Sequence, residues 1–194
     1  MKLVIIKYNA GNIQSVSFAL ERLGVEFIIT DDPEAIQNAD KVIFPGVGEA
    51  STTMNYLRNK KLDKLIVSLK QPLLGICLGM QLMCKYSEEN DTTCLGIFNE
   101  TVKRFIPEGD LKVPHMGWNN LALANSWLDP AIEGKYAYFV HSYYVPVNEF
   151  TSAVTEYTTP FSAAMHQNNF YAVQFHPEKS AGAGELVLKS FLKV

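Results

Sequence analysis

A run of apolar residues that ends in Gly-Ile-Cys-Leu-Gly constrains this fold more than any other stretch of the chain. Leu73 to Ile76 predict a buried strand, and Leu78 to Tyr86 predict a helix directly behind it. Gly75 and Gly79 lack a Cβ, so the backbone can turn sharply from strand to helix. The turn would hold the sulfur of Cys77 at the positive N-terminus of the helix, where the thiolate is favoured. A small buried cysteine between packing glycines is the alternative for the pentapeptide alone.

The composition is that of one α/β domain rather than two. The chain has 194 residues, 47% of them hydrophobic, which suffices for one sizeable core, so we expect a single domain over residues 1–194. The net charge of -3, without a long basic run, argues against nucleic acid and membrane partners. No apolar run approaches the roughly 20 residues that span a bilayer, and none near the N-terminus is typical of a signal peptide.

The cysteines favour a reducing compartment. Cys77, Cys84 and Cys94 are odd in number and lack the spacing of a zinc site. We therefore expect a soluble cytoplasmic protein without a metal.

The first half alternates between strands and helices. Strands are predicted at 2–6, 25–30, 41–44 and 73–76, and helices at 13–23, 31–37 (a short turn) and 54–69, the last with a break near Lys60-Lys61. This order predicts a parallel, doubly wound sheet, in which sites lie at the carboxyl ends of the strands.

The second half contains shorter β runs separated by turns. They lie at 97–104, 121–123, 138–141, 163–166 and 171–174, and a helix is expected over 183–192. We expect these runs to extend the first sheet. Cys84 is expected in the core, and Glu88 to Asp91 at a solvated helix end.

Two polar segments follow predicted strands. In Pro45-Gly46-Val47-Gly48, the glycines can turn backbone N–H groups toward a developing oxyanion, although an ordinary tight turn is the alternative. In the second segment, an extended backbone would project His176 and Glu178 to the same side, so that the carboxylate orients the imidazole. His176 could then exchange protons with Cys77. A polar turn is the alternative for His-Pro-Glu alone.

Taken together, these motifs resemble the class I glutamine amidotransferases. Gly75 to Gln81 and His176 to Glu178 carry the general resemblance. A second set resembles the glutaminase subunits of imidazole glycerol phosphate synthase: Gly11-Asn12-Ile13-Gln14-Ser15-Val16, Pro45-Gly46-Val47-Gly48, His115-Met116-Gly117-Trp118-Asn119, His141-Ser142-Tyr143 and His176-Pro177-Glu178-Lys179-Ser180. These motifs span nearly the whole chain. One departure is Lys7-Tyr8-Asn9, where that family often has Asp-Tyr-Gly.

The resemblance implies a flavodoxin-like α/β fold, with a mostly parallel central sheet flanked by helices and a nucleophile elbow. It implies that the Cys77 thiolate attacks the side-chain amide of L-glutamine and that ammonia leaves with a proton from His176, which Glu178 holds. The oxyanion would be held by backbone N–H groups of Val47, Gly48 and Leu78.

The same resemblance implies the binding residues and a partner. Residues that match glutamine-binding positions are Gly46, Gly48, Gln81, Glu89, Ser142 and Tyr143, and residues that match the subunit interface are Asn12, Tyr138 and Lys179. The implied partner is a (β/α)₈ cyclase subunit in a heterodimer. It would use the ammonia to make imidazole glycerol phosphate and an aminoimidazole carboxamide ribonucleotide in histidine biosynthesis. No metal or organic cofactor is implied.

Three alternatives remain at this level. The chain could serve another acceptor, as in an anthranilate or pyridoxal-phosphate synthase, although the first loop and Lys179-Ser180 argue against these. A cysteine peptidase on a related fold would leave Gln81 and His141-Ser142-Tyr143 without a role. A non-catalytic binding module with an inert elbow would leave Cys77 unreactive toward iodoacetamide.

Overall fold

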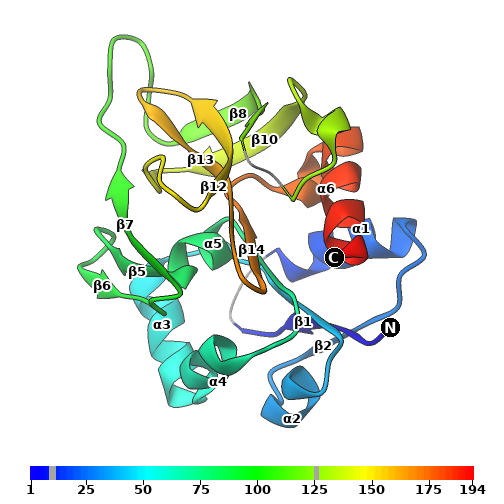
Figure 1. The fold of residues 1–194 in the computed structure, drawn as a ribbon. Helices are drawn as coiled ribbons and strands as arrows, with labels where there is room; N and C mark the ends of the chain where they lie inside the picture. The colour runs from blue at the N-terminus through cyan, green and yellow to red at the C-terminus, as the bar shows by residue number, and fades with distance from the viewer. Residues whose placement is uncertain (9–11, 125–126) are drawn as a thin grey trace.

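The computed structural model describes residues 1–8, 12–124 and 127–194. The predicted polar loop at residues 8–12 therefore lies largely outside the described residues. The helices are α1 (Ile13–Arg22), α2 (Pro33–Gln37), α3 (Ala50–Asn59), α4 (Leu62–Ser68), α5 (Leu78–Met83) and α6 (Ala181–Lys193), with 3₁₀ turns η1 (Pro130–Ile132) and η2 (Pro177–Lys179) (Figure 1). The strands are β1 (Leu3–Ile6), β2 (Phe27–Thr30), β3 (Lys41–Phe44), β4 (Leu73–Ile76), β5 (Cys84–Ser87), β6 (Thr92–Thr93), β7 (Phe98–Arg104), β8 (His115–Asn120), β9 (Ala122–Leu123), β10 (Tyr136–His141), β11 (Tyr143–Tyr144), β12 (Thr151–Glu156), β13 (Pro160–Gln167) and β14 (Phe170–Val173).

An eight-stranded sheet forms the centre of the molecule, in the order β2-β1-β3-β4-β14-β13-β12-β9. Its first five strands are parallel and the remaining three are antiparallel, which confirms the predicted mostly parallel α/β sheet. Strand β14 comes from the end of the chain but pairs with β4, with Val173 opposite Ile76. This pairing brings the segment after Val173 beside the predicted elbow.

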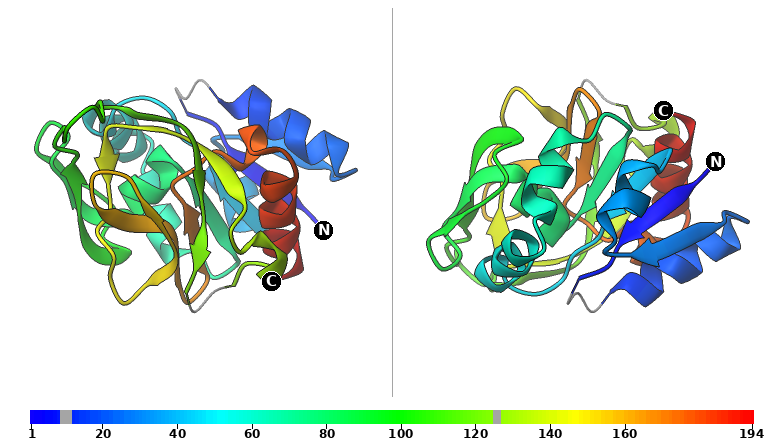
Figure 2. Two further views of the ribbon diagram at one scale, coloured as in Figure 1. Left: turned by 90° about the horizontal axis from the view of Figure 1, so that it is seen from above. Right: turned by 90° about the horizontal axis from the view of Figure 1, so that it is seen from below.

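Helices cover both faces of this sheet, and the strand sequence explains why. In β1, Val4 and Ile6 lie in the core beneath α2, α3 and α4, whereas Leu3 and Ile5 lie in the core beneath α1 and α6. Successive side chains of a strand point to opposite faces, so a continuous apolar run is buried only between two helical layers. Figure 2 shows α1 and α6 together on one side of the sheet.

The helix after the elbow is shorter than predicted. We predicted helix to Tyr86, but α5 ends at Met83 and the next four residues form β5. Tyr86 and Ser87 pair with both β6 and β7, and this sheet pairing outweighs the weak helical pattern of the segment. The predicted helix end at Glu88 to Asp91 is instead the turn between β5 and β6.

The second half extends the first sheet only in part. Strands β9, β12, β13 and β14 join it, but β8 and β10 form a separate pair, and β5, β6, β7 and β11 form a third sheet. The sequence patterns missed β6, β8, β11 and β12. In the first half, the long predicted helix begins at Ala50, where Glu49 caps the N–H groups of Ser51 and Thr52. Its predicted break is confirmed at Lys61, which has φ 58°.

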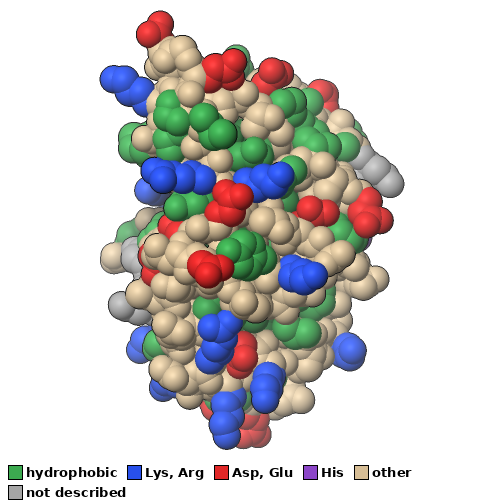
Figure 3. All heavy atoms as spheres, turned by 90° about the vertical axis from the view of Figure 1, so that its left-hand side faces the viewer, with side chains coloured by type: hydrophobic (Ala, Val, Ile, Leu, Met, Phe, Trp, Pro, Cys, Tyr) green, Lys and Arg blue, Asp and Glu red, His purple; other side chains and the backbone are tan. Residues whose placement is uncertain are grey.

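Charged side chains are interspersed over the surface. On the face shown in Figure 3, basic, acidic and hydrophobic side chains alternate without a continuous basic area. Within the described parts of the chain, no helix is long and apolar enough to cross a membrane. The same residues contain no cluster of three or more His, Cys, Asp or Glu that could hold a metal ion.

Candidate active site

The backbone at Cys77 forms the sharp turn that the sequence predicted. Cys77 has φ 52° and ψ -107° between β4 and α5, a conformation that non-glycine residues seldom adopt. Its N–H donates to the Val173 carbonyl oxygen at 2.8 Å, which ties the turn to β14. A Cβ on Gly79 would overlap the carbonyl oxygen of Phe44, so the close approach of β3 requires glycine.

The His176 imidazole and the Glu178 carboxylate lie just beyond β14. His176 Nδ1 lies 2.7 Å from Glu178 Oε1, and the side chains are only 0% and 1% exposed. The expected extended backbone is wrong, because Pro177 to Lys179 form η2, but this tight turn also brings the two groups together. Asn12 Nδ2 donates to the same carboxylate oxygen at 3.0 Å.

The charges around His176 favour its protonated form. Burial of the imidazole opposes a charge, but Cys77 and Glu178 outweigh it and raise the pKa of His176 to about 10. Since Nδ1 contacts Glu178, the other ring nitrogen is left for chemistry. That atom, Nε2, is buried and makes no hydrogen bond within the described parts of the chain. An imidazolium beside Cys77 stabilises the thiolate and can protonate a leaving group.

The other two cysteines have a different environment. Cys84 is fully buried, as predicted, and burial raises the pKa of its thiol well above the usual range. Burial also raises the pKa of Cys94, to about 12. Neither thiol has an imidazolium beside it, so both are held in the unreactive thiol form.

A cavity of about 320 Å³ opens beside Cys77. Its lining includes every predicted glutamine-binding residue except Gly46. The residues that line it are Val47, Gly48, Cys77, Leu78, Gln81, Glu89, Pro114, Val140, His141, Ser142 and Tyr143. Sequence reasoning did not assign Pro114 or Val140 to the site, because neither carries a polar side chain.

Two of the predicted binding side chains already have partners. Glu89 Oε2 accepts a hydrogen bond from the N–H of Ala50 at 2.8 Å, and burial raises the pKa of Glu89. Gln81 Nε2 donates to the Tyr143 carbonyl oxygen at 2.8 Å and to Gln174 Oε1 at 2.9 Å. Gln174 is a residue that the sequence assigned only to a strand, yet its side chain reaches the site.

The predicted oxyanion donors do not all point into the cavity. The N–H of Leu78 donates to the Gly46 carbonyl oxygen at 3.3 Å, so this donor is occupied by the loop itself. Gly48 has φ 126°, a conformation open mainly to glycine. The Tyr8 hydroxyl donates to the carbonyl of Pro45 from beneath the loop. In this conformation the predicted set of oxyanion donors is incomplete, because the Leu78 N–H is already bonded.

The three residues predicted at a partner interface differ in their exposure to solvent. Lys179 is exposed, and its Nζ lies 5.9 Å from the centre of the Tyr138 ring. Tyr138 also contacts the ring of Trp118, which is 53% exposed and which the sequence did not single out for an interface. Asn12 is buried, and its amide holds Glu178.

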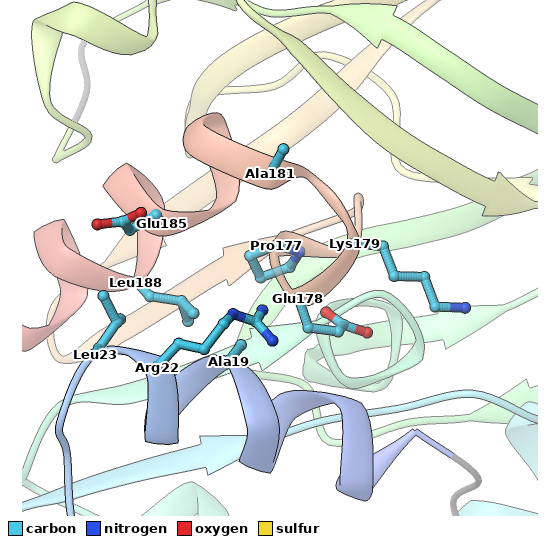
Figure 4. A pocket seen from close by; sticks show the side chains of 9 residues that line it. All are labelled: Ala19, Arg22, Leu23, Pro177, Glu178, Lys179, Ala181, Glu185 and Leu188. Atoms are coloured by element: carbon cyan, nitrogen blue, oxygen red, sulfur yellow. The ribbon is translucent and has the colours of Figure 1, made fainter.

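A second cavity, of about 570 Å³, lies on the far side of Glu178, between α1 and α6. Glu178 points toward α1 while the Lys179 side chain extends away from the cavity centre (Figure 4). Cys77 lines the first cavity and Glu178 the second, and His176 is completely buried. Cys77, His176 and Glu178 therefore lie between the two cavities.

Two glycines in α6 differ in how closely they approach η2, so alanine substitutions at both show whether this packing matters. A Cβ on Gly184 would overlap the Pro177 carbonyl oxygen, whereas a Cβ on Gly182 would meet nothing within 4 Å. We expect Gly184→Ala to destabilise the fold by about 1–3 kcal/mol and to lower activity, since η2 carries Glu178. Gly182→Ala should instead stabilise it by up to about 1 kcal/mol. Thermal unfolding and turnover check both, and equal behaviour of the two variants would contradict the expectation.

Comparisons with known proteins agree with this geometry. The family model for glutamine amidotransferase class-I matches residues 4–194. The chain is 61% identical to the imidazole glycerol phosphate synthase subunit HisH of Bacteroides thetaiotaomicron, over 99% of each chain. It is 44% identical to the HisH subunit of Vibrio parahaemolyticus, over 100% of this chain and 98% of the other.

Solved structures show the same fold at low sequence identity. A glutamine amidotransferase crystal structure superposes with a TM-score of 0.76 at 19% identity, covering 98% of this chain and 97% of the other. PurLQS from Thermotoga maritima gives a TM-score of 0.67 at 13% identity, over 99% of this chain and 97% of that one. The chain therefore belongs to the class I glutamine amidotransferase family and, within it, to the HisH subunits of imidazole glycerol phosphate synthase.

Proposed function

We propose that this chain is the glutaminase subunit of imidazole glycerol phosphate synthase, with Cys77 as nucleophile. The observation that carries the proposal is the position of Cys77, whose strained turn opens into the glutamine-sized cavity while it adjoins the buried His176–Glu178 pair. Relatives named HisH match this chain over its whole length. A thiol nucleophile needs an imidazole beside it as general acid and base, and a carboxylate that orients the imidazole. Cys77, His176 and Glu178 lie in this order.

In the proposed reaction, the Cys77 thiolate attacks the side-chain amide carbon of L-glutamine and forms a C–S bond. The tetrahedral intermediate then breaks its C–N bond, and ammonia leaves with the proton of His176. Water adds to the thioester, His176 accepts a proton from it, and the C–S bond breaks to release glutamate. Glu178 keeps the imidazole oriented and stabilises its charge throughout.

Glutamine would lie in the cavity beside Cys77. The Glu89 carboxylate suits the substrate's α-ammonium group, and the backbone of Gly46, Gly48, Ser142 and Tyr143 can contact its polar groups. Gln81 offers a further amide at the cavity wall. Neither this step nor hydrolysis of the thioester needs a metal or organic cofactor.

A direct test supplies the purified chain with amide-labelled glutamine, alone and with a cyclase partner. We expect glutamate and labelled ammonia with the partner present. Wild-type protein that forms no glutamate in either condition, while correctly folded, would contradict the proposed function.

The partner we propose is a (β/α)₈ cyclase subunit that forms a heterodimer with this chain. It would consume the ammonia and produce imidazole glycerol phosphate and the aminoimidazole carboxamide ribonucleotide. The cluster of exposed Trp118, half-buried Tyr138 and exposed Lys179 supports this surface, because aromatic side chains are enriched at interface centres. Tyr138 also accepts, through its carbonyl, the N–H of His176 at 2.9 Å, so this surface connects directly to the site.

The incomplete oxyanion site supports control by that partner. Leu78 cannot donate to an oxyanion while its N–H is held by the Gly46 carbonyl. The Val47 peptide, between two glycines, can turn its N–H toward the site when the loop rearranges. One missing donor typically costs about 10²–10³ in rate, so we expect very low glutaminase activity alone and strong stimulation by the cyclase with its nucleotide ligand. Full activity of the isolated chain would contradict this control while leaving the catalytic residues unaffected.

Lys179→Ala is expected to weaken this stimulation. Its ammonium group lies over Tyr138 at the proposed interface, where it can pair with a carboxylate of the partner. The matched control is Lys189→Ala, which removes a lysine whose only ion pair among the described residues is with Glu185 on α6. Titration of activity with cyclase measures the effect, and an equal response of both variants would contradict the role of Lys179.

We further propose that residues 1–194 act as one domain in the cytoplasm. Strand β14 lies within the sheet between β4 and β13, so the two halves of the chain share one core. Cys77, Cys84 and Cys94 are unpaired, as in a reducing compartment.

A further inference from the structure

The side chain of Gln174 contacts the sulfur of Cys77. Gln174 is completely buried after β14, and its Nε2 lies 3.6 Å from Cys77 Sγ. An amide side chain can present either its oxygen or its N–H group to a neighbour, so its orientation decides what this contact does.

The Tyr143 carbonyl determines that orientation. A carbonyl oxygen can only accept, and Gln81 lies 2.8 Å from it, so Gln81 must direct its NH₂ group there. The same Nε2 lies 2.9 Å from Gln174, which must therefore present its oxygen to Gln81. The NH₂ group of Gln174 is then the end that faces Cys77.

A second chain of hydrogen bonds holds the Tyr143 carbonyl. His141 Nδ1 lies 2.7 Å from this oxygen and must donate to it, so His141 Nε2 accepts from His115 Nδ1 at 3.2 Å. Asn119 lies 3.4 Å from the remaining nitrogen of His115. Burial lowers the pKa of His115 to about 4 and that of His141 to about 3, so both rings are neutral, as these roles require.

Aromatic side chains hold the two histidine rings in place. His115 stacks between the rings of Tyr157 and Phe139, with centroids 4.1 Å and 5.0 Å away. Phe105 lies 5.3 Å from the ring of His141. The Tyr143 carbonyl, which orients Gln81 and Gln174, is therefore held by tightly packed groups. The side-chain amide of Gln174 cannot rotate by 180° without breaking several hydrogen bonds.

We propose that Gln174 is a catalytic residue, which donates a hydrogen bond to the Cys77 thiolate and is oriented for this by Gln81 and the Tyr143 carbonyl. The inference rests on the proposed function in one respect, that Cys77 is the nucleophile. An N–H···S bond stabilises negative charge on sulfur. It favours the thiolate before attack, and again when the sulfur leaves as the thioester is hydrolysed.

Gln174 would act alongside the titratable groups that surround Cys77. His176 is the principal cation, and Glu178 acts through it. Tyr8 lies close enough for Cys77 to raise the pKa of its hydroxyl further, although burial is the larger cause. His141 is neutral, because burial lowers its pKa and the charge on His176 lowers it further. The only neutral N–H donor to Sγ from a side chain within the described residues is Gln174.

Gln174→Met tests the inference, because methionine fills a similar volume and cannot donate to sulfur. The rate of Cys77 alkylation by iodoacetamide is measured against pH, followed by single-turnover thioester formation. A hydrogen bond to a charged group contributes about tenfold or more. We expect the alkylation midpoint, which is the pH at which the alkylation rate is half-maximal, to rise by about one pH unit. Thioester formation should fall about tenfold. The KM for glutamine should change little, because Gln174 does not line the cavity.

A matched control separates this effect from lost packing. Gln71 Nε2 donates to the Ile36 carbonyl at 2.9 Å, and Gln71 does not line the cavity beside Cys77. Gln71→Met therefore removes a hydrogen bond from a side-chain amide that lies elsewhere. It should lower thermal stability without moving the alkylation midpoint. If Gln174→Met does not fold, the isosteric Gln174→Glu serves instead, and its carboxylate should raise the midpoint further.

A measurement on the unsubstituted protein completes the test. The side-chain NH₂ signal of labelled Gln174 should shift when Cys77 is alkylated, and the signal of Gln71 should not. An unchanged midpoint in the variant that folds, or an unchanged Gln174 signal, would overturn the inference. Alkylation needs no glutamine, so a chain that failed to hydrolyse glutamine would refute the proposed function separately.

Discussion

Replacing Cys77 with alanine is expected to abolish glutamine hydrolysis, by at least about 10⁴-fold, while the fold and partner binding are retained. The sulfur is the only thiol beside an imidazolium in the described structure, and alanine leaves no atom that can form the thioester. The side chain lines a cavity, so its loss should cost little packing. Steady-state glutamate formation with the cyclase present measures the effect.

Two controls make this result specific. Ammonia at high concentration should still support the coupled reaction in Cys77→Ala, since only the source of ammonia is lost. Cys84→Ala removes a fully buried thiol and should cost about 1 kcal/mol of stability with activity retained. Glutamine turnover near the wild-type rate in Cys77→Ala, or an equal loss in Cys84→Ala, would show that the assigned nucleophile is wrong.

Removing the imidazole should cost far more than neutralising the carboxylate that holds it. We expect His176→Asn to lower thioester formation about 10⁴-fold or more, because His176 is the only imidazolium beside Cys77 among the described residues and supplies the proton with which ammonia leaves. Glu178→Gln should be at least about tenfold milder. A glutamine oxygen can still accept from His176 Nδ1 and Asn12 Nδ2, so the orientation survives while the charge is lost. Single-turnover thioester formation compares the two variants, and equal defects would mean that Glu178 does more than orient and stabilise the imidazole.

The pH dependence provides a second measurement on Glu178→Gln. The Glu178 carboxylate is one cause of the raised His176 pKa of about 10. Without this carboxylate the pKa of His176 falls, so the imidazolium loses its proton at a lower pH. The alkaline limb of the pH–rate profile should therefore shift to lower pH. An alkaline limb that stays in place would contradict the electrostatic role of Glu178.

The sequence by itself determined the elements whose causes are local. The Gly-X-Cys-X-Gly pattern predicts a sharp turn from strand to helix, and the backbone at Cys77 forms this turn with φ 52° and ψ -107°. The continuous apolar run of β1 likewise predicts burial between two helical layers, as observed. Cys77, His176 and Glu178 could be proposed as catalytic residues because their residue types and neighbours carry the chemistry, and the structure brings the three together.

Only the tertiary structure decided how these elements meet, because the deciding contacts join residues far apart in the chain. Pairing of β14 with β4 places Gln174 on the sulfur of Cys77, 97 residues away. Strand pairing also ends α5 at Met83, against the local helical pattern. The Gly46 carbonyl, in the loop after β3, accepts the N–H of Leu78, the first residue of α5. Such contacts depend on where whole strands and loops lie, and residue pattern alone does not specify this.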